Sequence, residues 1–341
     1  MLRYIALRIA LMVPALLAIS VIVFALIELP PGDYLSNEMT ELAARGETAS
    51  LARLQFLRQE FSLDAPLIER YAIWLGAMPG ASGFNGLLQG NWGWSFEYGK
   101  PVADVIGDRL GLTIALNFAT ILFVYAMAFP IGVYSATRQY SIGDYGFTVL
   151  GYLGLAVPNF LFGLILLYYA NLWFGLSVGG LMAPEYIGQD WSLDKLGSVL
   201  AHLIVPTIVI GLSGTAAMIR RLRANLLDEL GKPYVAAARA RGLSERRLIL
   251  KYPLRAALGP FVADVGNLLP SMVSGAVIVS VVLNLPTVGP VLIAALRSQD
   301  QFLAGFILLF AALLTIVGML VSDLLLAALD PRVRIGQRAV R

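Results

Sequence analysis

The chain has 341 residues, of which 58% are hydrophobic and 14% charged, and its formal net charge is +3. A soluble domain carries about 25% charged residues, so this chain lacks the polar surface that a water-soluble protein needs. It contains no cysteine, which excludes a disulfide framework and cysteine-based metal chemistry. Its single histidine, His202, has no neighbours in the sequence that complete a metal site or a catalytic triad, and we expect it to be structural. The composition predicts a polytopic membrane protein.

An apolar run from about residue 9 to residue 29 follows Arg3 and Arg8 at the N-terminus. About 20 residues is the length of a membrane span, whereas the apolar region of a signal peptide has about 7–15 residues. The run ends in Glu28-Leu-Pro-Pro-Gly-Asp, without a small-x-small cleavage site. We therefore predict a retained first transmembrane helix.

Six apolar segments are long enough to cross a bilayer core of about 30 Å at about 1.5 Å per helical residue. They cover approximately residues 9–29, 111–135, 147–176, 200–219, 257–284 and 302–329. The third and fifth are longer than a span needs, which predicts tilt, kinks at Pro158 or Pro270, or ends outside the lipid. The predicted fold is all-α, with six transmembrane helices. Its predicted parts are a first helix (1–30), a polar loop with short helices (31–109), a five-helix part (110–330) and a tail (331–341).

The distribution of Lys and Arg predicts the orientation. With the N-terminus in the cytosol and six crossings, seventeen of the 25 basic residues fall on the cytosolic side: two before the first segment, Arg138, ten between Arg220 and Arg255, and four after Leu329. The loop 31–109 falls on the opposite side and is acidic, with ten Asp and Glu against six Lys and Arg. Both termini are therefore predicted to be cytosolic.

No catalytic domain remains once the spans are assigned. The loop 31–109, the largest extramembrane segment, contains no nucleotide, metal or triad motif, and nothing in the chain reads Gly-x-x-x-x-Gly-Lys-Ser/Thr. We predict a non-enzymatic chain that holds no metal or cofactor and binds no nucleic acid. If ATP drives its action, ATP and Mg²⁺ are bound by another chain.

The segment from Lys232 to Leu248 is basic, favours helix and lies between two long apolar segments. It contains alanines that favour helix and allow close approach, namely Ala236, Ala237, Ala238 and Ala240. Gly242 permits a turn with positive φ, and Ser244 can cap a second short helix that begins at Glu245. The arginines of the segment that can meet an acidic groove or lipid headgroups are Arg239, Arg241, Arg246 and Arg247. Two interpretations stay open: a docking element for a cytosolic partner, or a basic loop that obeys the positive-inside rule.

Polar residues inside the spans are further candidates, because a charge in lipid is costly and usually faces protein or a water-filled path. Four of them share one face of the fifth segment at i, i+3, i+7 and i+10: Asp264, Asn267, Ser271 and Ser274. This stripe either lines a cavity or packs against another helix. We expect Asp323 to pair with an Arg from the cytosolic side. Asn117 and Asn159 either line such a cavity or join two helices by hydrogen bonds.

From end to end, the chain resembles the inner-membrane permeases of the peptide/opine/nickel branch of bacterial ABC importers, the dipeptide and oligopeptide permease type. The resemblance rests on six passages in the right order over the whole length. They are Arg8-Ile-Ala-Leu-Met-Val-Pro through Leu29-Pro-Pro-Gly-Asp, Phe61-Ser-Leu-Asp-Ala-Pro-Leu, Gly90-Asn-Trp-Gly-Trp-Ser-Phe, Pro158-Asn-Phe, the segment from Tyr234 to Arg247, and Leu329-Asp-Pro-Arg-Val-Arg.

The resemblance implies a type I ABC importer (MetI-like) permease fold in the bacterial inner membrane. It also implies a second, similar permease, two ATPase subunits that bind ATP and Mg²⁺, and an extracytoplasmic binding protein that delivers the solute. The loop 232–252 would be the coupling loop that contacts an ATPase, through Tyr234 and the alanines, Gly242, Ser244 and charged residues named above. Pro158, Asn159 and the stripe from Asp264 to Ser274 would lie along the translocation path.

Two departures from the family pattern concern the coupling loop and the solute. An acidic residue of the loop's Glu-Ala-Ala pattern is missing, since the chain has Ala236-Ala-Ala. The fifth helix has Ser280-Val-Val-Leu-Asn-Leu-Pro-Thr-Val-Gly where a Glu-Thr-Val-Phe-x-x-Pro-Gly-x-Gly pattern is common. The expected solute is a peptide or peptide-like compound, and an opine, an oligosaccharide or a nickel chelate stays open.

Two groups of residues keep open roles under this resemblance. The run Gly211-Leu-Ser-Gly-Thr-Ala-Ala allows close helix approach, either between the two permeases or for flexing during alternating access. The outer aromatic residues are an interfacial belt, which we favour, or contacts for the binding protein; they are Trp92, Trp94, Phe96 and Tyr98.

Two other function classes fit the sequence less well. A stand-alone secondary carrier commonly has internal repeats and ion-binding carboxylates in the membrane, and the halves of this chain show no repeat. An intramembrane hydrolase would need Asp264 and Asp323 as a proton-sharing dyad, and neither residue has a flanking glycine-rich motif.

Overall fold

The computed structural model describes residues 2–30, 32–45, 48–174 and 179–329, and of residues 2–4, 48–50, 174 and 267–275 it describes the backbone only. The chain forms two compact units. We call the first, Met1–Ala10, Leu112–Pro286 and Leu314–Arg341, the core unit, and the second, Leu11–Gly111 and Thr287–Leu313, the loop unit. Each unit is described separately below.

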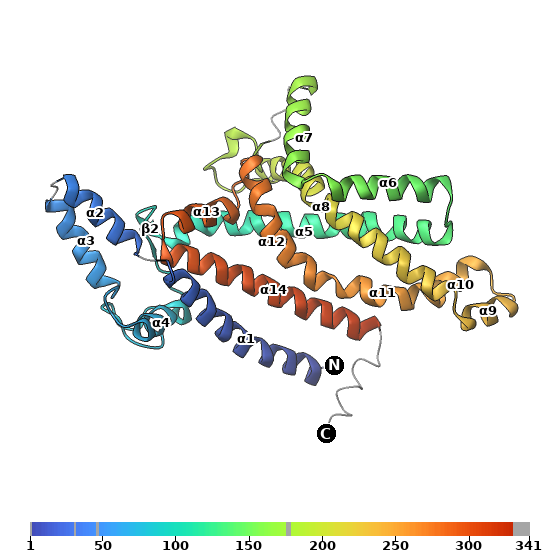
Figure 1. The fold of residues 1–341 in the computed structure, drawn as a ribbon, viewed down its shortest axis with the longest axis horizontal. Helices are drawn as coiled ribbons and strands as arrows, with labels where there is room; N and C mark the ends of the chain where they lie inside the picture. Colours follow the sequence, from blue (N-terminus) through green and yellow to red (C-terminus); the bar gives the residue numbers. More distant parts are fainter. Residues whose placement is uncertain (1, 31, 46–47, 175–178, 330–341) are drawn as a thin grey trace. The chain divides into compact units, whose positions relative to one another are not determined.

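Helices make up most of the described residues, which confirms the predicted all-α fold (Figure 1). The α-helices are α1 (Leu2–Glu28), α2 (Tyr34–Arg45), α3 (Thr48–Glu60), α4 (Leu67–Leu75), α5 (Val102–Thr137), α6 (Ile142–Ala156), α7 (Asn159–Phe174), α8 (Leu193–Leu230), α9 (Pro233–Ala240), α10 (Glu245–Lys251), α11 (Pro253–Ala263), α12 (Val265–Val282), α13 (Val288–Arg297) and α14 (Gln301–Leu329). The other described elements are the 3₁₀ turns η1 (Leu87–Gln89) and η2 (Pro184–Tyr186) and an antiparallel ribbon of β1 (Trp94–Ser95) and β2 (Lys100–Pro101).

Four helices are long and apolar enough to span a membrane: α1 over Ile5–Glu28, α5, α8 and α14. The pair α6 and α7 passes the same test together, but the two helices are bent by 100° relative to each other. Figure 1 shows them as separate helices that run in different directions. The bend lies at Val157, whose φ of −86° and ψ of 123° are extended. The following Pro158 disfavours helical backbone at the residue before it. The kink predicted at Pro158 is confirmed.

The predicted fifth segment, 257–284, is not one helix. Helix α11 ends at Ala263, Asp264 forms the junction, and α12 begins at Val265. Among the described residues there are four single-helix candidates, or five spans if the bent pair counts as one. The six-span count, the cytosolic termini and the predicted domain boundaries therefore stay predictions.

Helix α5 begins nine residues before the predicted second segment. Its first turns bury Val102, Val105 and Ile106 in the loop unit, where they pack with Val291 and Leu303. Burial of these apolar side chains stabilises the first turns of α5. The helix therefore begins before the segment 111–135 that hydropathy indicates as a span.

Helix α8 is the centre of the core unit and packs against α6, α7, α11 and α12. Its buried side chains Leu222 and Leu226 are fully covered, and α11 contributes Leu254 and Phe261 to the same cluster. A continuous apolar stripe on this long helix therefore organises the packing of its neighbours.

The small residues of α8 serve packing within the chain. A Cβ at Gly211 would lie 2.8 Å from Cδ1 of Phe123 on α5, which is too close for real atoms. On the facing helix α6, a Cβ at Gly154 would lie 3.0 Å from Leu212. Gly211 therefore allows α5 to lie close to α8, and Gly154 allows α6 to do so. The two roles that the sequence leaves open for the run as a whole stay open.

Aromatic side chains form much of the core of the loop unit. Phe96 is buried, and its ring centroid lies 5.3 Å from that of Phe61 and 5.8 Å from that of Phe302. Trp92 stacks on Phe306 with the centroids 4.3 Å apart. These two residues of the outer aromatic group therefore stabilise the unit from within, instead of forming an exposed belt.

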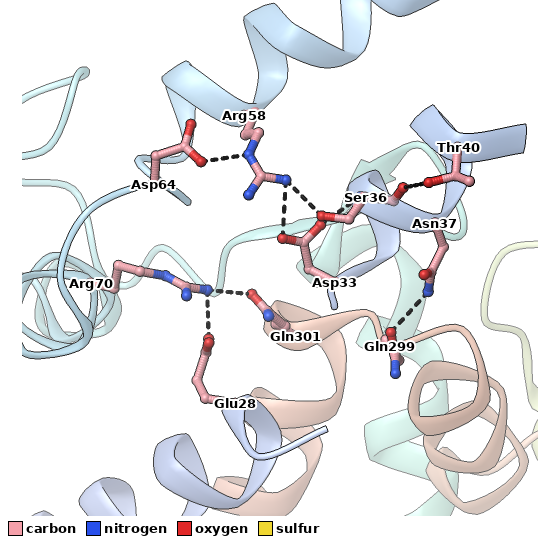
Figure 2. A network of polar contacts seen from close by, with 10 residues as sticks. All are labelled: Glu28, Asp33, Ser36, Asn37, Thr40, Arg58, Asp64, Arg70, Gln299 and Gln301. Atoms are coloured by element: carbon pink, nitrogen blue, oxygen red, sulfur yellow. Dashed lines mark hydrogen bonds and ion pairs between the residues drawn. The ribbon is translucent and has the colours of Figure 1, made fainter. Parts of the chain in front are cut away.

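A polar network joins separate segments of the loop unit (Figure 2). Arg58 contacts Asp33 and Asp64 at 3.3 and 2.6 Å, and so joins the start of α2 to the segment that follows α3. Arg70 of α4 donates to Glu28 at the end of α1, at 2.6 Å, and to Gln301 of α14, at 2.8 Å. The charges therefore hold together elements that are far apart in the sequence.

The loop before α14 is fixed by the buried carboxylate of Asp300. One oxygen accepts hydrogen bonds from the Ser95 hydroxyl at 2.6 Å and from the Glu97 backbone N–H at 3.1 Å. The other accepts from the Leu303 backbone N–H at 3.2 Å, which caps the first turn of α14. Burial raises the pKa of the Asp300 carboxyl, and these donors offset only part of that rise.

We expect Asp300→Ala to destabilise the detergent-solubilised chain at every pH, by about 1–3 kcal/mol, because buried donors lose their acceptor. In the wild type, the raised pKa means that the folded state holds this proton more tightly. The part of the stability that comes from this tighter proton binding is therefore highest at low pH and is lost as the pH rises through the folded pKa. The hydrogen bonds that the carboxylate accepts are a separate contribution. Asp300→Asn keeps an acceptor oxygen without a titrating proton and should flatten this dependence. Melting curves at several pH values test both variants, with the exposed Asp108→Ala as control; equal curves for Asp300→Ala and Asp108→Ala would contradict the expectation.

Candidate functional site

Helices α9 and α10 form a helical hairpin between α8 and α11, within the predicted coupling loop 232–252 (Figure 1). Val235 and Leu248 are fully buried and pack with Ala238 in a small apolar cluster of their own. The hairpin is therefore a packed substructure. Ala238, which the sequence places among the contact residues, is buried at 7% exposure and supports the hairpin from within.

The turn of the hairpin depends on Gly242, whose φ is +79°. Its N–H donates to the carbonyl of Arg239 at 3.0 Å. A Cβ at this position would meet nothing within 4 Å, so the need for glycine comes from the backbone alone. The predicted positive-φ turn is present. Ser244 stands at the N-cap of α10, as predicted, but its side chain makes no capping hydrogen bond.

An ion pair across the turn and a hydrogen bond at the start of α9 reinforce the hairpin. Arg239 donates to Glu245 across the turn, at 2.5 and 3.1 Å. This contact lowers the pKa of the Glu245 carboxyl and raises the pKa of the Arg239 guanidinium, so both groups are charged at neutral pH. In the first turn of α9, Tyr234 donates to Glu229 of α8 at 2.6 Å. Burial and this hydrogen bond raise the pKa of Tyr234 to about 12, which keeps the phenol protonated.

The exposed surface of the hairpin combines small side chains with positive charge. Its exposed members from the predicted set are Tyr234, Ala236, Ala237, Arg239, Arg241, Gly242, Ser244, Glu245 and Arg246. Small residues allow the backbone of a partner to approach closely, and arginine forks suit carboxylates. The surface is chemically suited to an acidic groove.

The predicted path residues are only partly brought together. Asp264 is buried at the junction of α11 and α12 and forms an ion pair with Arg221 of α8. The side chains of Asn267, Ser271 and Ser274 lie outside the described residues. Pro158 lies at the bend between α6 and α7, and the Asn159 side-chain amide donates to Ser213 of α8 at 3.2 Å. Asn159 therefore joins α7 to α8 by a hydrogen bond, which is one of the two roles that the sequence left open for it.

Two other predictions concern single side chains. Asp323 of α14 pairs with Arg8 of α1 at 2.8 Å, which confirms an arginine partner for it. The His202 ring nitrogen Nδ1 lies 2.8 Å from the carbonyl of Ser198 one turn earlier. This local contact fits the structural role expected for His202.

Two features of the structure have no signal in the sequence. Asp144, in the first turn of α6, makes a bidentate ion pair with Arg223 of α8, 79 positions away. The loop unit contains a cavity of about 290 Å³, lined by rings such as Phe24, Trp74 and Phe302 and by the Glu28–Arg70 pair. Neither feature leaves a pattern of short spacing, so local motifs could not reveal it.

Comparison with known proteins gives matches along the chain. A family model described as "Binding-protein-dependent transport system inner membrane component" matches residues 128–335, and one for the N-terminal part of such components matches residues 1–117.

Named relatives cover nearly the whole length. The oligopeptide transport system permease protein AppB of Bacillus subtilis is 32% identical over 338 residues, which are 98% of this chain and 99% of the relative. The dipeptide transport system permease protein DppB of Escherichia coli K12 is 30% identical over 353 residues, covering 98% and 99%. The oligopeptide transport system permease protein OppB of Mycobacterium tuberculosis is 30% identical over 306 residues, covering 88% and 90%.

The range 128–335 includes α6 to α14 and with them the α9–α10 hairpin, and the apolar helices agree with a multi-pass protein of the inner membrane. The chain belongs to the family of inner-membrane components of binding-protein-dependent transport systems.

Proposed function

We propose that the chain is the permease subunit of an ABC importer for peptides, and that ATPase subunits drive it through the α9–α10 hairpin. The chain forms half of the translocation path, a second, similar permease forms the other half, and an extracytoplasmic binding protein delivers the peptide. The three relatives above are named as oligopeptide or dipeptide transport permeases, which supports the choice of solute.

The observation that carries the coupling role is the exposed, packed hairpin that directly continues α8. Gly231 and Lys232 alone separate the end of α8 at Leu230 from α9 at Pro233. A protein that pushes on the hairpin therefore displaces the central helix of the core unit. A basic loop that merely obeyed the positive-inside rule would need neither its own apolar cluster nor a closed turn.

In this proposal the chain performs no chemistry. ATP and Mg²⁺ are bound and ATP is hydrolysed by the two ATPase subunits, while this chain contributes the docking surface and the path. Opines, oligosaccharides and nickel chelates are the alternative solutes, since Ser280 and Thr287 stand where the family pattern commonly has Glu and Gly.

Site-directed cross-linking tests the docking role cleanly, because the chain contains no cysteine. Ala237→Cys on the hairpin should cross-link to an ATPase subunit in membranes of the native host, whereas the exposed Asp190→Cys before α8 should not. Equal cross-linking from both positions would contradict docking through the hairpin.

Uptake by the purified complex in proteoliposomes tests the transport role. We expect ATP-dependent uptake of di- and oligopeptides that requires the binding protein. Uptake by this chain alone, driven by a proton or sodium gradient, would show a secondary carrier instead. ATP-dependent uptake of another solute class, without peptide uptake, would contradict the peptide assignment only.

A further inference from the structure

Two arginines near the end of α8 join it to different helices of the core unit. Arg221 forms an ion pair with Asp264, at the junction of α11 and α12, and Arg223 forms one with Asp144, in the first turn of α6. An α-helix turns about 100° per residue, so positions 221 and 223 point about 200° apart. The two pairs therefore leave α8 on opposite sides.

The pair of Arg223 and Asp144 is built for a fixed geometry. Nε of Arg223 donates to Oδ1 of Asp144 at 2.9 Å, and Nη2 donates to Oδ2 at 2.8 Å. The Tyr140 backbone N–H also donates to Oδ2, at 3.0 Å, and the Asp144 side chain is only 3% exposed. A planar guanidinium that meets a carboxylate at two points resists rotation as well as separation.

Helix α8 is continuous from this pair to Leu230, and two residues separate it from the hairpin. From Arg223 to Leu230 it rises about 10 Å at about 1.5 Å per residue. Leu222 and Leu226, both fully buried, hold this part of α8 in the core unit. A Cβ at Gly132 of α5 would lie 3.1 Å from Leu222, so α5 also approaches α8 closely here. A displacement of the hairpin therefore has only Gly231 and Lys232 to cross before it reaches α8, and the hydrogen bond from Tyr234 to Glu229 bridges this junction.

We propose that Arg223–Asp144 and Arg221–Asp264 are the linkage that carries movement of the α9–α10 hairpin from α8 to α6 on one side and to α11 and α12 on the other. In this proposal the four residues act as positioning residues, through the helices that they join. Because Asp144 is buried and bidentate, while Arg221 is 45% exposed, Arg223–Asp144 is the stronger connection. This proposal rests on the hairpin being the ATPase-docking element.

The transport stoichiometry of the assembled complex tests the linkage. Asp144→Asn keeps the shape of the side chain and removes its charge, and Arg223→Lys keeps the charge and removes the fork. The matched control is Arg220→Lys, an exposed arginine on the same helix. Each variant is purified with the subunits that copurify with the wild type, and solute uptake and ATP hydrolysis are measured in the same proteoliposomes.

We expect uptake per ATP hydrolysed to fall at least about tenfold in Asp144→Asn and about threefold in Arg223→Lys, and to stay unchanged in Arg220→Lys. Cross-linking of Ala237→Cys to the ATPase should persist in all of them, because the docking surface is intact. A role in folding alone would lower the yield of complex but leave uptake per ATP unchanged in the complex that forms.

Wild-type uptake per ATP in both Asp144→Asn and Arg223→Lys overturns the linkage and leaves the proposed function intact. An equal fall in Arg220→Lys overturns it too, because the effect would then follow the loss of any guanidinium at this end of α8, whether or not it is paired with Asp144. If the wild-type hairpin does not cross-link to an ATPase, the proposed function and the linkage fail together. Should Asp144→Asn yield no complex, Arg223→Lys alone decides between these outcomes.

Discussion

Gly242→Pro is expected to reduce ATP-driven uptake at least about tenfold while the chain still inserts in the membrane. Proline fixes φ near −65°, whereas Gly242 has a φ of +79° and donates a hydrogen bond that proline cannot make. Forcing a non-glycine residue into the left-handed region costs about 1–2 kcal/mol, and a lost hydrogen bond about 1 kcal/mol. The hairpin would therefore seldom adopt the shape that docks.

A graded series at position 242 separates backbone conformation from side-chain bulk. Asparagine tolerates positive φ, so Gly242→Asn should retain most uptake. Gly242→Ala should be intermediate, because its Cβ would have open space and only the backbone is strained. Uptake, substrate-stimulated ATP hydrolysis and the amount of chain in the membrane are measured for each. Normal stimulated hydrolysis in the assembled Gly242→Pro complex would show that this turn is not needed for coupling.

Arg70→Met is expected to cause the largest loss of stability in the loop unit, about 3–5 kcal/mol. The Glu28 and Arg70 side chains are only 8% and 14% exposed, and Figure 2 shows Arg70 between Glu28 and Gln301. Removing one partner of a buried pair leaves the other charge without compensation. The variant should melt at a lower temperature, measured by size-exclusion chromatography of heated, detergent-solubilised protein.

A second substitution should recover much of this loss. In the double variant Glu28→Gln/Arg70→Met neither position of the pair carries a charge, so the desolvation penalty of the pair disappears together with its attraction. Arg53→Met, at an exposed arginine of α3, is the control for loss of one positive charge. If Arg70→Met melts at the same temperature as Arg53→Met, the pair does not stabilise the loop unit.

Local signals in the sequence were sufficient to predict the helical class and the geometry of the hairpin. Alanine propensity predicts α9, and the preference of glycine for positive φ predicts the turn at Gly242, because both depend on a few neighbouring residues. An arginine partner for Asp323 was predictable because a carboxylate inside the membrane needs a nearby positive charge. The kink at Pro158 follows from the restriction that proline imposes on Val157.

Contacts between distant parts of the chain were not predictable in the same way. In the sequence, Asp144 shows only the pattern of an acidic residue in the first turn of a helix. Its contact with Arg223 depends on the packing of α6 against α8. The break at Asp264 interrupts an apolar segment whose hydropathy continues across it. Phe96 was assigned to a belt at the membrane surface, since composition alone does not show that Phe61 and Phe302 cover it.

The 38 residues of α8 correspond to about 57 Å of helix, nearly twice the thickness of a bilayer core. Because the helix is unbroken up to Leu230, the number of residues after Arg223 sets the direction in which the hairpin faces. One inserted residue would turn the hairpin by about 100° around the helix axis, whereas four would return it close to its original direction, one turn further out. The number of residues between Arg223 and the hairpin is therefore constrained as well as their type, because a deletion there would turn the exposed residues of the hairpin in another direction.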